Sequence, residues 1–169
     1  LVHFSDRMEE SELDMNERQR ILFDNICDEI SQETGVEFQR SKAVFAGLSP
    51  EDDTANWSRF GTIGLEIKVD PETTYVYDRY LHSGSAIAYD RTQEGERFLE
   101  KYAPEQRQQM EALLREFPLD YGTYLKEYIT QRMKLSDYLG LSPEERKQKI
   151  RTPEIALSAP VDPKLIRVK

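Results

Sequence analysis

The 169-residue chain carries 32 acidic and 23 basic side chains, for a formal net charge of −9, and 38% of its residues are apolar. This size and composition fit one domain with its own core. The sequence contains no apolar run long enough to cross a bilayer, and the acidic balance disfavours nucleic acid as a partner. One cysteine and two histidines exclude an internal disulfide and disfavour a metal site built on Cys or His.

The N-terminal third predicts a short edge strand followed by a long helix. LVHFS (residues 1–5) alternates as an edge strand does, and residues 16–34 repeat apolar side chains at helical spacing. Gly35 suits the position just after that helix. Cys27 falls on the apolar face, so we predict a buried structural thiol rather than a nucleophile.

Two strand-like segments flank a helix start in the next part of the chain. KAVFAG (42–47) is typical of a short buried strand. Ser49-Pro50 then predicts a short helix, with Trp57 anchoring it on the core. Residues 63–69 place aliphatic side chains on one face and charged ones on the other, as in a half-buried antiparallel strand.

The following residues predict the return of this strand. Asp70-Pro71 forms a turn, and TTYVYD (73–78) is predicted to return as a second strand. We therefore expect a two-stranded ribbon over residues 63–77 with its aliphatic face inward. His82-Ser83-Gly84-Ser85 then predicts a loop, after which AIAY (86–89) adds a third strand.

From Thr92 onward the period becomes helical. Helices are expected at residues 92–102, 104–117, 121–140 and 142–150. The proline-punctuated tail, residues 152–169, is predicted to be extended, with LIRV (165–168) as a further strand. We see no linker, so residues 1–169 are expected to form a single domain.

The positions of the tyrosines allow two interpretations. All nine lie between residues 75 and 138, and those at 121, 124 and 128 share one helical face. Such a stripe suits a stacking platform for a ring-shaped ligand, but a core position with the hydroxyls at the rim is favoured.

Few residues suggest chemistry, because the usual nucleotide, metal and hydrolase motifs are absent. His82, Ser83 and Ser85 form either a ligand-holding loop or a simple turn, and the turn is favoured. Glu127 is the candidate catalytic base if it is buried, and otherwise an ordinary surface carboxylate.

One family resemblance covers about half the chain. LVHFS resembles the first strand of ADP-ribosyltransferase-like domains, and the segment from KAVFAG to TTYVYD is similar to their middle section. The resemblance implies that His3 contacts the ribose of NAD and that Tyr75 or Tyr77 flanks the nicotinamide. It also implies a late glutamate on a strand, whereas Glu127 falls in a predicted helix.

We therefore predict an α+β fold: a small antiparallel sheet covered by several helices. The leading functional hypothesis is an acidic protein-interaction or regulatory domain with a protein partner and no cofactor, in an intracellular setting. The alternative is an NAD-dependent ADP-ribosyltransferase-like enzyme, so enzymatic activity is left open. The start at Leu1 rather than Met favours a processed product or an excised domain.

Overall fold

The computed structural model describes residues 10–48, 65–94, 99–100, 102–158 and 160–168. The helices are α1 (Glu10–Thr34), α2 (Arg79–Glu94), α3 (Pro104–Glu116), α4 (Tyr121–Thr130), α5 (Leu135–Gly140) and α6 (Pro143–Lys149), with 3-10 turns η1 (Arg40–Lys42) and η4 (Pro163–Leu165). The strands are β1 (Ala43–Gly47), β2 (Leu65–Ile67), β3 (Tyr75–Asp78), β4 (Met133–Lys134), β5 (Pro153–Ser158) and β6 (Ile166–Val168).

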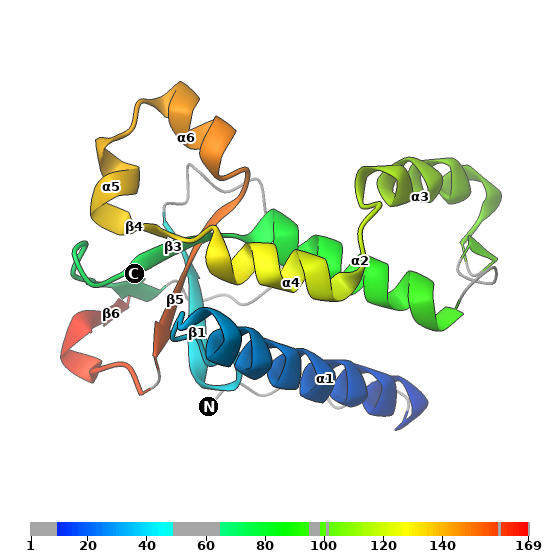
Figure 1. The fold of residues 1–169 in the computed structure, drawn as a ribbon, viewed down its shortest axis with the longest axis horizontal. Helices are drawn as coiled ribbons and strands as arrows, with labels where there is room; N and C mark the ends of the chain where they lie inside the picture. The colour runs from blue at the N-terminus through cyan, green and yellow to red at the C-terminus, as the bar shows by residue number, and fades with distance from the viewer. Residues whose placement is uncertain (1–9, 49–64, 95–98, 101, 159, 169) are drawn as a thin grey trace.

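The fold is α+β, with helices packed around a small antiparallel sheet (Figure 1). Within the described residues, four strands pair in the order β1-β5-β3-β4, and β2 pairs with β6 in a separate two-stranded sheet. All of these pairs are antiparallel. None of the described helices combines the length and the apolar character needed to span a membrane.

Strand β3 of the main sheet is buried on both faces. Neighbouring side chains on a strand point to opposite faces, and on β3 both Val76 and Tyr77 are almost fully buried. Tyr77 packs with residues of α1, α2 and α4 in one cluster, whereas Val76 packs with residues of α5 and β5 in another. Strand β3 therefore suits an interior position, between β5 and β4.

Several predicted elements are confirmed. The long N-terminal helix is α1 and the helix at 104–117 is α3. The strand at 42–47 is β1, but its predicted burial is wrong, because β1 lies at the edge of the sheet with Val44 and Phe45 exposed. Cys27 lies fully buried in the core, and burial raises the pKa of its thiol to about 12, as expected for a structural cysteine. Helix α6 starts as predicted, with Ser142 and Glu145 forming a reciprocal capping box.

The predicted ribbon over residues 63–77 is wrong in its pairing. Strand β2 hydrogen-bonds to β6, and β3 hydrogen-bonds to β4 and β5, so the two strands joined by the Asp70-Pro71 turn belong to different sheets. The cause lies at the far end of the chain. Residues 153–168, predicted as an extended tail, supply β5 inside the main sheet and β6 beside β2.

The predicted loop at 82–85 and strand at 86–89 are also wrong, because both segments lie in α2. The buried residues Ser85, Ala88 and Tyr89 are three and four apart, which is the spacing of a helix rather than of a strand. The helix predicted from Thr92 begins inside the end of α2, and much of it lies outside the described residues.

The predicted helix at 121–140 is interrupted. Helix α4 ends at Thr130, Met133 and Lys134 pair with β3, and α5 starts at Leu135. Because Met133 and Lys134 pair with β3, their backbone hydrogen-bonding groups are not available to a continuous helix. The strand predicted at residues 1–5 and the helix predicted from Ser49, with Trp57, lie outside the described residues.

Substitution of Gly84 by Ala is expected to destabilise the protein by up to about 2 kcal/mol. A Cβ at this position of α2 would lie 2.5 and 2.6 Å from two ring carbons of the buried Phe117. Overpacking of this kind costs about 1–3 kcal/mol, against about 1 kcal/mol gained from helix propensity. Urea unfolding measures the effect, and Gly140→Ala is the control, since a Cβ on Gly140 meets nothing within 4 Å. Equal stability of the two variants would contradict this account of α2 packing.

Candidate functional site

The predicted site residues fall on three elements of the described chain. Tyr75 and Tyr77 lie on β3, the residues His82, Ser83 and Ser85 lie in the first half of α2, and Glu127 lies in α4. His3 is outside the described residues. The structure packs Tyr77 and His82 against the same ring, that of Tyr128, and leaves Ser83 exposed at the surface.

Tyr128 of α4 is the centre of this grouping. Its ring centroid lies 5.1 Å from that of Tyr77 and 5.5 Å from that of His82. Phe38 packs on both tyrosines, with centroid separations of 5.2 and 5.8 Å. Tyr77 and Tyr128 are both buried, so this part of the tyrosine set forms core rather than an exposed stacking platform.

His82 belongs to a polar chain that links α2 to α1. The Nε of Arg40 donates to Nε2 of His82 at 3.3 Å, and Nη1 of Arg40 donates to Asp24 at 2.9 Å. Burial, reinforced by the positive charge of Arg40, lowers the pKa of His82 to about 4. The imidazole is therefore neutral at pH 7, with Nε2 as an acceptor, and cannot serve as a general acid there.

Ser85 and Glu127 have structural surroundings. The Oγ of Ser85 is buried and donates to the carbonyl of His82 at 2.6 Å, a bond within α2. Glu127 is partly buried in the last turn of α4, where its carbonyl accepts the N–H of Gln131. Its place on a helix agrees with the sequence pattern and not with the strand glutamate of ADP-ribosyltransferase-like domains.

Tyr128 forms a second polar pair with Glu154. Its hydroxyl donates to Oε1 of Glu154 at 2.8 Å, and Glu154 is only 8% exposed. Burial raises the pKa of Glu154 above its ordinary value, because it disfavours the charged form. Burial and the neighbouring Glu154 carboxylate likewise raise the pKa of Tyr128.

Arg132 joins the two tyrosines of β3 to the segment after α1. Its Nη1 donates to the carbonyl of Glu37 at 3.0 Å and to the hydroxyl of Tyr77 at 3.2 Å. The guanidinium also lies 3.9 Å from the ring centroid of Tyr75, a cation–π contact. These contacts fix β4 and β3 against residues 37–38, so the cluster holds three parts of the chain together.

Sequence reasoning missed the charged members of this cluster: Asp24, Arg40, Arg132 and Glu154. Two of them left a signal. Arg132 continues the apolar stripe of α4, where a cation is unexpected, and Glu154 alternates with Pro153 and Ile155 in what proves to be an interior strand. Asp24 and Arg40 meet only because α1 packs on η1, and the local sequence of neither segment indicates this contact.

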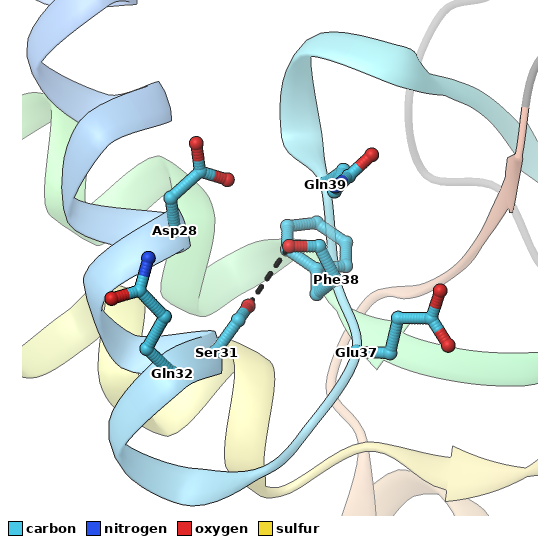
Figure 2. Close-up of a pocket in the computed structure, with 6 residues that line it drawn as sticks. All are labelled: Asp28, Ser31, Gln32, Glu37, Phe38 and Gln39. Carbon is cyan, nitrogen blue, oxygen red and sulfur yellow. Dashed lines mark hydrogen bonds between the residues drawn. The ribbon is translucent and has the colours of Figure 1, made fainter.

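A small hollow opens on the surface next to this cluster (Figure 2). It measures about 210 Å³ and lies between α1 and the segment that leads to β1. The residues around it are Asp28, Ser31, Gln32, Glu37, Phe38 and Gln39. The Oγ of Ser31 donates to the carbonyl of Phe38 at 2.9 Å and so connects the two walls. Two carboxylates and two amides give the rim oxygen acceptors suited to a cationic group.

Strand β1 continues directly from this hollow. Among the described strands it pairs with β5 alone, which places it at one edge of the main sheet. Its sequence, Ala-Val-Phe-Ala-Gly, carries no charge, and Val44 and Phe45 are 37% and 38% exposed. An uncharged edge strand with exposed apolar side chains is the type of surface that pairs with another chain.

No metal site is evident in the described part of the chain, where His, Cys, Asp and Glu side chains do not gather in groups of three or more. Comparison with protein-family models, with curated proteins and with solved structures found no match. The resemblance to ADP-ribosyltransferase-like domains, and with it NAD binding by His3, Tyr75 and Tyr77, stays a prediction from the sequence.

Proposed function

We propose that this protein is an interaction domain that adds an extended, basic segment of a partner protein to the edge of β1. The observation that carries the proposal is the edge position of β1 together with its uncharged sequence and exposed Val44 and Phe45. In strand addition, backbone hydrogen bonds supply affinity, and side chains next to the new strand supply specificity.

The charge of the partner is argued from the surroundings of β1. The chain has a formal net charge of −9. The hollow that precedes β1 carries the carboxylates of Asp28 and Glu37. A basic partner is attracted by both, and attraction between exposed charges weakens as salt rises. The charged groups around Tyr128, by contrast, bond to other side chains and to the backbone within the fold.

A peptide of eight alternating Val and Lys residues tests this proposal. We expect it to bind at low salt, to lose affinity at high salt, and to protect the β1 amides from hydrogen exchange. Phe45→Lys should lower the affinity about tenfold, because it puts a like charge on the paired surface, whereas Phe45→Glu, which removes the same ring but carries the opposite charge, should lower it less. Leu139→Lys, at an exposed apolar position of α5, is the control.

Three results would count against strand addition by a basic segment. The first is a peptide that leaves β1 amide exchange unchanged. The second is an equal loss of affinity in Phe45→Lys and Leu139→Lys. The third is tighter binding of a matched Val-Glu peptide, which would reverse the assigned charge of the partner.

A further inference from the structure

A larger apolar groove lies where the two sheets meet; one of its lining residues, Leu157, pairs with Val44 of β1. The groove measures about 640 Å³, within the range of small-molecule sites. One side is formed by residues 160–162 and by Leu165 of η4, just before β6, at the end of the fold opposite α3 (Figure 1). Its apolar lining includes Ile67, Val69, Leu157, Val161 and Leu165.

The walls of this groove are tied to each other through the backbone. Strand β2 pairs with β6, and the N–H of Lys68 donates to the carbonyl of Leu165 at 2.8 Å. On the opposite wall, Val69 and Leu157 pack against the apolar cluster formed by buried residues such as Val76 of β3, Ile155 of β5 and Leu135 of α5. Leu165 remains 40% exposed. The groove thus has one wall on the core and one wall on the small sheet, with apolar surface between them.

The charged residues of the lining give the groove a net negative charge. They are Asp70, Asp162 and Lys68. Each carboxylate is oriented by its own turn: Oδ1 of Asp70 accepts the N–H of Glu72 at 3.0 Å, and Oδ1 of Asp162 accepts the N–H of Lys164 at 2.9 Å. Together with the net charge of −9, two carboxylates against one ammonium favour a cationic ligand over an anionic one.

We propose that this groove binds a small apolar primary amine, with the hydrocarbon part on the apolar lining and the ammonium group on the carboxylates of Asp70 and Asp162. An alkyl ammonium is protonated at pH 7, as a lysine side chain is. The apolar contact supplies most of the affinity, and the two carboxylates select the charge of the ligand. Strand β1 contributes no residue to the lining, so this proposal stands whether or not strand addition is correct.

Calorimetric titration of the full chain with octylamine, 1-octanol and octanoate tests the proposal at pH 7 and low salt. Octylamine should bind most tightly and octanoate least. The variant Asp70→Asn/Asp162→Asn keeps the side-chain oxygens that accept the turn N–H groups, so it should fold, yet it should lower octylamine affinity about tenfold and leave octanol unaffected. Lys68→Met should raise octylamine affinity a few-fold, and Leu165→Ser should weaken all three ligands.

The control removes the same charge elsewhere. Glu100→Gln/Glu111→Gln changes two exposed carboxylates outside the groove lining and should leave octylamine binding within about twofold of the unmodified protein. The proposal is overturned if octylamine does not bind, if octanol or octanoate binds as tightly, or if the Asn variant behaves like this control.

Discussion

Acidification from pH 6.5 to pH 4 is expected to remove about 3 kcal/mol of unfolding free energy through His82. In the folded protein, burial and Arg40 lower the pKa of this imidazole from 6.5 to about 4. Between those values the unfolded chain binds a proton that the folded chain does not, so the stability contributed by neutral His82 is complete above pH 6.5 and is lost as the pH falls toward 4. Each pKa unit is worth about 1.4 kcal/mol.

The measurement compares urea unfolding of two proteins from pH 4 to pH 8. Both carry His3→Gln, so that His82 is the one histidine left in the chain, and the second also carries His82→Gln. The amide oxygen of Gln can accept from Arg40 but does not titrate. The second protein is expected to be less stable at pH 8, since it lacks the ring contacts with Phe23 and Tyr128, but to lose less stability on acidification. Parallel pH profiles would show that His82 is not held neutral by its surroundings.

Tyr128→Phe is expected to destabilise the protein by about 1 kcal/mol while Glu154 is protonated and by about 2 kcal/mol once it is ionised. The substitution removes the hydroxyl that donates to the buried Glu154 carboxylate. A hydrogen bond to a charged acceptor is worth about 1.5–3 kcal/mol and a neutral one about 1 kcal/mol. The loss should therefore grow as Glu154 ionises.

Glu154 itself determines the sign of this pH dependence. Its folded-state pKa is raised above the ordinary value of 4.5, mainly by burial. Its contribution to stability is present below pH 4.5 and is lost as the pH rises through the folded-state pKa. Glu154→Gln should remove this loss, so the variant should gain on the unmodified protein as the pH increases.

A double-mutant cycle separates the hydrogen bond from general packing. In the Glu154→Gln background, Tyr128→Phe should cost about 1 kcal/mol at every pH. Tyr124→Phe on the same helix is the control, because its hydroxyl accepts a backbone N–H from Leu119 and contacts no carboxylate in the described structure. A cost of Tyr128→Phe that does not vary with pH would contradict an ionising, buried Glu154.

The agreement between sequence and structure is best where a pattern is local. Helices α1, α3 and α6 were predictable because their apolar spacing, or the capping residues Ser142 and Pro143, act within a few residues of chain. Cys27 on the apolar face of α1 is buried as predicted.

The wrong predictions in α2 arose where the residue spacing of a short segment fits both a helix and a strand or turn. Gly84 between two serines suggested a turn, yet in α2 it lets Phe117 approach the helix backbone. AIAY reads equally as a strand or as a helix over four residues, and only its packing on α4 selects the helix.

By itself, the sequence determined the α+β class, the long first helix, the buried thiol and the negative net charge, because each depends on composition or on spacing along a few turns. Only the tertiary structure decided which strands pair and which polar groups meet. Strand β5 lies about 75 residues from β3 and more than 100 from β1, and its insertion between them buries Glu154 against Tyr128. Such contacts depend on the closure of long loops around a shared core, and that information is absent from any single segment.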